Sequence, residues 1–294
     1  MPQPSLKLNE TKFVVHNYDL AATLGCGQAF RWEMRQARWY GVVGGCALEL
    51  WQAEETIFVR SASPQTDWDW LAAYLQVDVD LAAITRTFPK DAPMRHAVAA
   101  CQGLRLLRQE PWECLASFIL SSTKQIVQIR QIIARLCERH GHPVAVQSGE
   151  VAAFAFPTPA QIAALTEAQL RDCKMGFRSP YLLRTAQMIR ANELNLDNLR
   201  RLDLPAARAT LLGLPGVGPK IADCVLLFAY GFPSAFPVDV WVMKSLRRFY
   251  FQNRQVSLDR LRDFSATHFG PHAGYAQQYL FHSLRRSEGK KLSH

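Results

Sequence analysis

Lys220 and Asp239 lie nineteen residues apart in the stretch LPGVGPKIADCVLLFAYGFPSAFPVD. A neutral lysine amine is a nucleophile that forms Schiff bases, and a carboxylate can act as an acid or base or can stabilise positive charge. The two residue types together indicate covalent chemistry at an electrophilic carbon. An aspartate that precedes an apolar helical run also has a simpler role, because it can cap that helix.

The glycines before Lys220 indicate a very short turn between two helices. Residues 206 to 212 lack helix breakers, and residues 220 to 229 carry apolar side chains at helical spacing. Gly216 and Gly218 can adopt backbone angles that other residues avoid. Lys220 then falls in the first turn of the second helix, where the positive helix end disfavours its ammonium form.

This hairpin predicts a contact with an anion such as a DNA phosphate. Because Gly216 and Gly218 have no side chains, a phosphate can approach the N–H groups that open the second helix. An ordinary helical hairpin with a glycine turn explains LPGVG better when the motif is taken alone. The added presence of Lys220 and Asp239 favours the DNA interpretation.

The hairpin, Lys220 and the PVD that ends at Asp239 resemble the helix-hairpin-helix plus Gly/Pro/Asp motif of the base-excision DNA glycosylases. The lysine resembles the bifunctional branch of that superfamily, and VGPKIADC is similar to the 8-oxoguanine DNA glycosylases. The resemblance spans roughly residues 12 to 286. It implies that Lys220 attacks the anomeric carbon of a deoxyribose and forms a Schiff base, while Asp239 stabilises the developing positive charge.

Four residues match positions that read the extruded base in this family. GCGQAFRW is similar to its GQxFRW, where the glycine carbonyl accepts a hydrogen bond from N7–H of oxidised guanine; Gly27 holds that position. GYAQQYLF is similar to GxAQxxLF, which implies that Gln277 binds the Watson–Crick edge and that Phe281 stacks on one face. Cys224 matches the cysteine on the other face. Taken alone, the glutamine and phenylalanine would be a surface residue and a core residue.

The polar run SSTKQ, residues 121 to 125, interrupts an apolar helical pattern and predicts a helix end or a wet cleft. In the family, two asparagines here enter the gap left by the extruded base, and an arginine reads the opposite cytosine. Thr123, Lys124 and Gln128 replace them. We therefore expect these residues to contact DNA with a relaxed preference for cytosine.

Two further DNA contacts follow from the resemblance. In the turn MGFRSPY, Phe177 matches an aromatic wedge and Arg178 matches an arginine that contacts the orphaned cytosine. Phe177 could instead only anchor the loop. Trp241 stands where these enzymes commonly have a phosphate-binding histidine, so we expect rearranged phosphate contacts.

Composition narrows the class of protein. Lys and Arg number 34 against 25 Asp and Glu, and the net charge of +9 suits a polyanionic partner. The seven cysteines include no CxxC pair, which argues against a zinc site, a disulfide framework and the iron–sulfur cluster of the endonuclease III and adenine glycosylase branches. We predict no cofactor and no protein metal site, although relatives hold a cation between hairpin carbonyls and phosphate.

The order of patterns predicts an α+β fold. Residues 13 to 60 show four short strand-like runs with a Gly44-Gly45 hairpin turn, and helical patterns dominate from Asp67 onward. We expect an N-terminal antiparallel sheet domain with its following helices over residues 1–104. A two-part helical catalytic region over residues 105–294 follows, with the hairpin at 206–230.

The predicted function is a bifunctional DNA glycosylase and lyase that excises 8-oxoguanine from double-stranded DNA after base flipping. The N-terminus has no signal-peptide layout and no apolar run is long enough to span a bilayer. We therefore expect a soluble intracellular monomer, in a bacterial cytoplasm or nucleoid or in a eukaryotic nucleus. Two alternatives stay open, an alkylated-base glycosylase and a non-catalytic helix-hairpin-helix DNA-binding protein.

Overall fold

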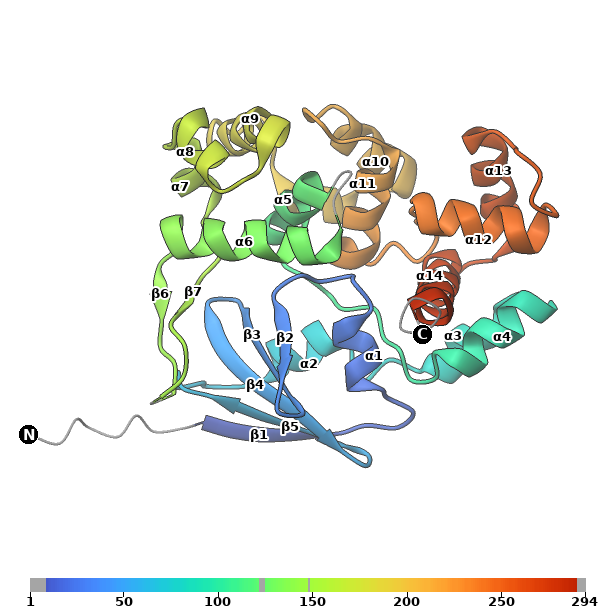
Figure 1. Ribbon diagram of the computed structural model, residues 1–294, viewed down its shortest axis with the longest axis horizontal. Coiled ribbons are helices and arrows are strands. Elements are labelled where there is room, and N and C mark those ends of the chain that lie inside the picture. The colour runs from blue at the N-terminus through green and yellow to red at the C-terminus, as the bar shows by residue number, and fades with distance from the viewer. Residues whose placement is uncertain (1–8, 122–124, 148, 290–294) are drawn as a thin grey trace, which may run out of the picture.

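The computed structural model describes residues 9–121, 125–147 and 149–289. An N-terminal antiparallel sheet is followed by a long series of helices, so the predicted α+β class is confirmed (Figure 1). Among the described residues, none of the helices combines the length and the apolar character needed to cross a bilayer.

The N-terminal sheet contains five antiparallel strands in the order β1-β5-β4-β3-β2. They are Asn9–Val14 (β1), Trp32–Arg35 (β2), Arg38–Val43 (β3), Cys46–Ala53 (β4) and Thr56–Ser61 (β5). The last four match the predicted runs. The edge strand β1 was not predicted because none of its side chains is buried, so the pairing with β5 defines it rather than an apolar pattern.

The predicted turn between β3 and β4 forms at Gly44 and Gly45. Both glycines have positive φ, +56° and +76°, as a tight hairpin turn that follows the strand twist requires. Across the hairpin, Trp39 is buried and Trp51 stacks on Phe58 with ring centroids 5.3 Å apart. Both tryptophans therefore have a packing role in the sheet.

One face of the sheet packs against two short helices, Leu20–Gly25 (α1) and Asp69–Leu75 (α2). Alternate residues of β5, such as Ile57 and Val59, point into this core, as the two-residue repeat of a strand requires. Helix α1 was not predicted. Its N-cap is Asp19, whose side chain accepts a hydrogen bond from the N–H of Ala22 at 2.7 Å.

The second and larger core lies among the remaining helices. Their bounds are Leu81–Arg86 (α3), Ala92–Ala100 (α4), Pro111–Ser121 (α5), Ile126–His140 (α6), Pro159–Ala163 (α7), Glu167–Asp172 (α8), Ser179–Arg190 (α9), Leu204–Leu212 (α10), Pro219–Val225 (α11), Val240–Tyr250 (α12), Leu258–His268 (α13) and Ala273–Gly289 (α14). Helix α4 was not predicted, because only Met94 and Ala97 are buried along it. The short strands β6 (Pro143–Val144) and β7 (Ala153–Phe154) were also unforeseen.

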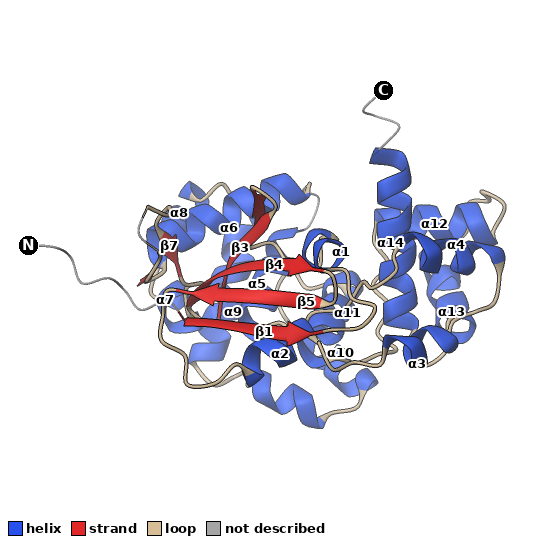
Figure 2. Cartoon of the chain, turned by 90° about the horizontal axis from the view of Figure 1, so that it is seen from below, coloured by secondary structure: helices blue, strands red, loops and turns tan. Residues whose placement is uncertain are grey.

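Helix α6 lies between the sheet and the upper helices, and α5 and α11 lie beside it near the middle of the molecule (Figure 1). The view from below shows α14 grouped with α3, α4, α12 and α13 at one end, away from strands β1, β5 and β4 (Figure 2). Elements distant in sequence thus converge around α11 and α14, which carry Lys220 and Gln277.

Gly41 makes room for a tryptophan that links the sheet to α2. Gly41 in β3 pairs with Trp32 in β2, and the Trp32 indole lies over the glycine. The indole Nε1 donates a hydrogen bond to the Tyr74 hydroxyl at 2.8 Å. Cross-strand contact of an aromatic ring with a glycine is a recurrent way to stabilise a sheet.

We expect Gly41→Ala to lower the free energy of unfolding by about 1–3 kcal/mol, the usual cost of overpacking. The added Cβ would lie 2.4 Å from Cε3 of Trp32, and the indole cannot move without straining its bond to Tyr74. Urea denaturation followed by circular dichroism measures the effect. Gly213→Ala is the control, because its Cβ would meet only the Thr210 carbonyl oxygen at 3.4 Å. Equal losses for the two variants would contradict the explanation.

Candidate active site

The predicted hairpin consists of α10, a turn over residues 213–218, and α11, and a five-residue π-helical turn, Leu226–Tyr230, continues from α11. Gly216 has φ +73°, and a Cβ there would lie 2.5 Å from the Tyr181 ring. A Cβ on Gly218 would meet no atom within 4 Å. Close packing therefore requires glycine at 216, whereas at 218 the start of α11 faces open space. Phosphate binding by these glycines stays a prediction.

Lys220 is the second residue of α11 and is half-buried. Its Nζ donates a hydrogen bond to Oγ of Ser121 at 3.1 Å and lies 5.1 Å from the centroid of the Phe118 ring. The Ser121 hydroxyl in turn donates to the carbonyl of Phe118 at 2.7 Å. The last turn of α5 therefore fixes the position of the half-buried amine.

Asp239 is the N-cap of α12, as predicted. Its Oδ1 accepts a hydrogen bond from the N–H of Val242 at 2.7 Å. Burial raises the pKa of its carboxyl, and this effect outweighs the opposing effects of the Val242 hydrogen bond and of the nearby positive charges of Lys220 and Arg285. Asp239 is therefore a stronger base than an exposed aspartate.

Lys220 and Asp239 interact electrostatically without forming a contact ion pair. Among the described residues, no carboxylate oxygen lies within 4.0 Å of the Lys220 nitrogen. The positive charge of Lys220 nevertheless lowers the pKa of Asp239, which places the two groups in one electrostatic environment. The hydrogen bond that Lys220 Nζ donates therefore goes to a neutral hydroxyl rather than to a carboxylate.

Cys224 lies one helical turn after Lys220 and is buried. Burial raises the pKa of its thiol to about 12, and the charge of Lys220 opposes that rise. The thiol is therefore neutral near pH 7 and acts as a small apolar surface close to the amine.

Gln277 and Phe281 lie one turn apart on α14, and both are buried. The Oε1 atom of Gln277 has no hydrogen-bond partner within the part of the chain that the structure describes. A buried amide oxygen without a partner is costly, and such an atom is available to a ligand. Close packing fixes the start of α14, because a Cβ on Gly274 would lie 2.3 Å from Leu227.

Gly27 lies in the loop between α1 and β2 and has φ +90°. A Cβ there would lie 2.6 Å from Ile126 on α6 and 3.1 Å from Nη1 of Arg285 on α14. The structure therefore brings Gly27 next to the helix that carries Gln277 and Phe281. This loop and α14 are linked again by the hydrogen bond from Nε2 of Gln278 to the Cys26 carbonyl, 3.5 Å long.

Gln28 holds this glycine loop in place through four buried hydrogen bonds. Its Nε2 donates to the carbonyls of Thr23 and Arg105, each at 2.8 Å. Its Oε1 accepts from the N–H of Leu107 at 2.9 Å, and its carbonyl accepts from Nε2 of Gln109 at 2.7 Å. The loop is thereby attached to the segment that connects the sheet with α5.

Sequence analysis missed two side chains of this site. Ser121 is the first residue of the polar run SSTKQ, and a polar residue after an apolar helix could have indicated its role. Arg285 was only the end of a predicted helix. No local pattern distinguishes it from its neighbour Arg286, because its importance comes from contacts with a loop more than 250 residues earlier.

The turn around Phe177 is only partly as expected. Phe177 is 56% exposed, as a wedge requires, and its ring has an edge contact with Tyr181. Arg178, predicted to contact the orphaned cytosine, is buried, which disagrees with that role. Its side chain is 1% exposed, and Nη1 donates to the Met175 carbonyl at 3.5 Å. The short 3₁₀ turn Gly176–Arg178 directs it inward.

The remaining predicted DNA contacts are distributed as follows. Gln128 is exposed near the start of α6, where its Oε1 accepts a hydrogen bond from the N–H of Gln125 at 3.1 Å. Trp241 is half-buried in the first turn of α12, and the Lys244 ammonium lies 5.6 Å from the centroid of its indole. Thr123 and Lys124 lie outside the described residues.

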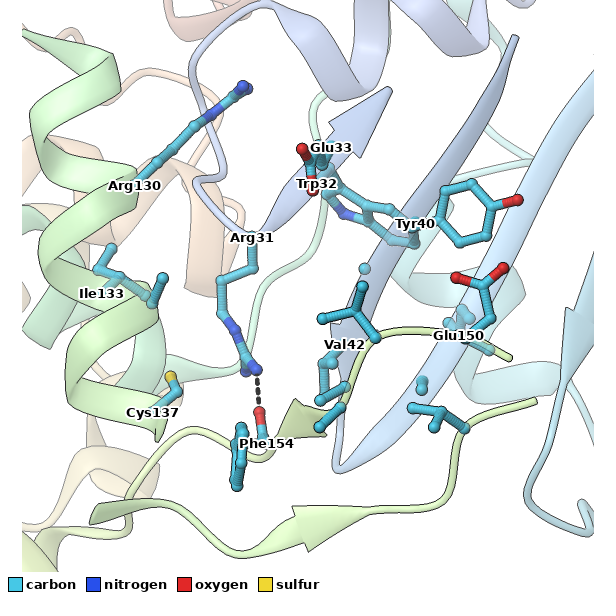
Figure 3. Close-up of a pocket in the computed structure, with 18 of the residues that line it drawn as sticks. Arg31, Trp32, Glu33, Tyr40, Val42, Arg130, Ile133, Cys137, Glu150 and Phe154 are labelled. Atoms are coloured by element: carbon cyan, nitrogen blue, oxygen red, sulfur yellow. Dashed lines mark hydrogen bonds between the residues drawn. The ribbon is translucent and has the colours of Figure 1, made fainter. Parts of the chain in front are cut away.

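A cavity of about 880 Å³ lies on the other side of α6, between that helix, the sheet and β7 (Figure 3). Its lining includes Arg31, Trp32, Tyr40 and Arg130. None of the predicted catalytic or base-binding residues lines it. Arg31 donates to the Phe154 carbonyl and forms an ion pair with Glu113 at 3.1 Å, so it connects the sheet with α5 and β7.

Two family models match the chain in succession. The model described as 8-oxoguanine DNA glycosylase, N-terminal domain, matches residues 10–115. The model described as HhH-GPD superfamily base excision DNA repair protein matches residues 116–264. The second match contains both Lys220 and Asp239.

Individual relatives resemble the chain over most of its length. The N-glycosylase/DNA lyase OGG1 of Arabidopsis thaliana is 30% identical over 94% of this chain and 78% of its own. A probable N-glycosylase/DNA lyase of Methanothermobacter thermautotrophicus is 31% identical over 68% of this chain and 70% of its own. The 8-oxoguanine glycosylase/lyase of Clostridium acetobutylicum, solved with double-stranded DNA containing cytosine opposite 8-oxoguanine, superposes with a TM-score of 0.90. It is 31% identical over 96% of this chain and 98% of its own.

We expect Asp239→Asn to leave the protein at least as stable as the wild type at pH 7, with a gain on the order of 1 kcal/mol. Asparagine keeps the helix cap and removes a buried charge. Folding raises the pKa of Asp239, so ionisation of this carboxyl destabilises the folded state. The destabilisation disappears as the pH falls below the ordinary pKa of an aspartate.

Urea denaturation of both proteins from pH 8 to pH 4 measures this difference. The excess stability of the variant should shrink as the pH falls, because the wild-type carboxyl becomes neutral. Asp203→Asn, at the exposed N-cap of α10, is a matched control that should show no such excess. If the stability of Asp239→Asn relative to the wild type were lower at pH 8 than at pH 4, the raised pKa of Asp239 would be contradicted.

Proposed function

Because the chain belongs to the helix-hairpin-helix-GPD superfamily of base excision DNA repair proteins, and within it to the 8-oxoguanine DNA glycosylases, we propose that it excises 8-oxoguanine from duplex DNA and then cleaves the strand as a lyase. The observation that carries the catalytic part is the Lys220 amine, half-buried, hydrogen-bonded to Ser121 and electrostatically linked to Asp239. The net charge of +9 supports a DNA partner.

The first step is base excision. The lesion is extruded from the duplex, because its glycosidic bond is inaccessible within the stack. The neutral Lys220 amine attacks the anomeric carbon, the glycosidic bond breaks, and its electron pair leaves with N9 of the base. Positive charge develops on the sugar, and the Asp239 carboxylate stabilises it.

The second step cleaves the strand. The attached Lys220 nitrogen loses a proton, the C1′–O4′ bond breaks as O4′ takes up a proton, and a protonated Schiff base forms between the lysine and the anomeric carbon. Loss of a proton from the neighbouring carbon then expels the 3′ phosphate by β-elimination. Asp239, whose pKa is raised by burial, is suited to accept protons in these transfers. These steps use only protein groups and DNA.

Base recognition is proposed for residues from three parts of the chain. Gly27 offers its carbonyl to N7–H, and Gln277 has a buried amide oxygen available for the Watson–Crick edge. Phe281 and Cys224 provide apolar surfaces for the two faces of the base. We propose that the exposed ring of Phe177 fills the gap in the duplex and that Gln128 contacts the opposite strand.

The two alternatives fit the site less well. An alkylated-base glycosylase requires the aspartate but not a nucleophilic lysine, and a non-catalytic hairpin requires neither. We further propose a reducing compartment for the protein, because all seven cysteines are free. A cation at the hairpin would be bound by backbone carbonyls, since no cluster of three His, Cys, Asp or Glu suited to a metal occurs among the described residues.

Lys220→Gln should abolish borohydride trapping on a duplex that contains 8-oxoguanine, while specific binding persists within a few-fold. The substitution removes the amine that forms the Schiff base but keeps a polar side chain beside Ser121. Gel electrophoresis measures the cross-link, and fluorescence anisotropy measures binding. Lys90→Gln, at an exposed lysine, is the matched control and should cross-link normally. Wild-type protein that binds and never cross-links would favour the non-catalytic alternative.

We expect wild-type excision rates opposite the four bases to differ by less than about tenfold, and Gln128→Arg to raise the cytosine preference. A well-placed arginine contact contributes about 1–3 kcal/mol of base discrimination, which glutamine at this position lacks. Single-turnover rates on four duplexes measure both effects, and rate ratios within one variant cancel any loss of the Gln125–Gln128 cap. Gln131→Arg, one turn away on α6, is the control. A strong cytosine preference in the wild type would overturn this expectation.

A further inference from the structure

Arg285 places a positive charge at the edge of the proposed base-binding residues. Its Nη1 lies 3.4 Å from the Cys26 carbonyl oxygen and 3.1 Å from the position of a Cβ on Gly27. Its Cζ lies 5.4 Å from the centroid of the Phe281 ring. The guanidinium therefore adjoins two of the four residues to which base recognition is assigned.

No carboxylate neutralises this charge at contact distance. Among the described residues, Arg285 has no ion pair within 4.0 Å, and its hydrogen bond to Cys26 goes to a neutral carbonyl. The side chain is half-buried, and burial lowers the pKa of its guanidinium, with the charge of Asp239 opposing that effect. The charge of Asp239 is in turn already balanced in part by Lys220.

A second arginine adds to the positive potential behind the Gly27 loop. Arg130 lies on α6 one turn after Ile126, which packs against Gly27. Its Nε is buried without a hydrogen-bond partner in the described part of the chain, and its charge repels that of Arg285. Figure 3 shows Arg130 directed away from Arg31, whose guanidinium turns toward Phe154. Two partly buried cations that repel each other favour negative charge nearby.

We propose that Arg285 selects the extruded base by its charge, an inference that rests on the proposed glycosylase function. When the glycosidic bond of 8-oxoguanine breaks, the electron pair passes to N9 and the neutral base leaves as an anion, which the guanidinium stabilises. A 7-methylguanine base is already cationic in DNA and leaves as a neutral molecule. Arg285 repels that base in the bound state, and departure of the base relieves this repulsion, so the charge disfavours the cationic purine through weaker binding rather than through the departure step.

The charge of Arg285 therefore changes the two excision rates in opposite directions when each rate is measured from free enzyme and free DNA. It lowers the barrier for a neutral oxidised purine, and it disfavours the cationic purines that an alkylated-base glycosylase excises. The repulsive part adds to the Gly27 carbonyl, which finds no N7–H on a 7-methylated purine, whereas stacking on Cys224 and Phe281 does not distinguish the two bases.

The test compares wild type, Arg285→Gln, Arg285→Lys and Arg286→Gln. Glutamine removes the charge and keeps a hydrogen-bond donor, and lysine keeps the charge. Arg286 is an exposed neighbour on α14 that donates to the Ala100 carbonyl at 2.8 Å, so it controls for loss of one charge from this helix. Single-turnover excision is measured for 8-oxoguanine and for 7-methylguanine in otherwise identical duplexes, at enzyme concentrations below the dissociation constant, so that the rates include binding. Affinity for a duplex with cleavage-resistant 2′-fluoro-7-methylguanine is measured alongside.

We expect Arg285→Gln to lower the ratio of 8-oxoguanine to 7-methylguanine excision at least tenfold and to tighten binding of the cationic lesion several-fold. Arg285→Lys should restore the ratio to within about threefold of wild type, and Arg286→Gln should leave it unchanged. An equal fall in both excision rates would show a merely structural role and overturn the inference. Weaker binding of undamaged duplex, with an unchanged ratio, would assign Arg285 to a phosphate and overturn it as well.

Cleavage of a duplex with a preformed abasic site separates this inference from the proposed function. That reaction needs Lys220 and no base. Wild-type protein that leaves the abasic duplex intact would contradict the proposed function. Wild-type cleavage of that duplex together with an unaltered lesion ratio in Arg285→Gln would contradict only the charge-selection inference.

Discussion

The hydrogen bond from the Lys220 amine to the Ser121 hydroxyl is the contact on which the site depends. It joins the end of α5 to the start of α11, two elements nearly a hundred residues apart in sequence. A hydroxyl can orient an ammonium or an amine without fixing its charge. A carboxylate at the same distance would stabilise the ammonium form and oppose nucleophilic attack. Because its partner is a serine, the amine therefore stays available for nucleophilic attack.

The N-termini of two helices have opposite electrostatic effects on Lys220 and Asp239. Lys220 lies in the first turn of α11, where the exposed N–H groups disfavour a cation. Asp239 caps α12, where the same kind of helix end favours an anion and donates the Val242 hydrogen bond. Burial raises the pKa of Asp239 in spite of that help. The fold thus holds the Lys220 amine near a carboxylate that binds a proton more readily than usual, because burial raises the pKa of Asp239.

The base-recognition residues are held by a rigid support outside the hairpin. Gln28 connects the glycine loop to Thr23, Arg105, Leu107 and Gln109 through buried hydrogen bonds. Gly274 lets α14 approach Leu227 directly after α11. Gly27 and Gln277 belong to elements at opposite ends of the chain. If both bind the same base, the glycine loop and α14 must each be held rigidly. Arg285 then touches the loop that Gln28 holds.

Local sequence determined the hairpin, the Asp239 cap, four of the five strands of the sheet and most helices, because glycine turns, caps and apolar periodicity act over a few residues. It also indicated which residue types could do the chemistry. Strand β1 and helix α4 were not predicted, since few or none of their side chains are buried, and the six residues of α1 are too few to show a helical period. Only the tertiary structure decided that Ser121 holds the amine, that Arg178 turns inward and that Arg285 meets Gly27. These contacts join segments far apart in the chain or depend on the direction of one side chain, and no local pattern encodes either.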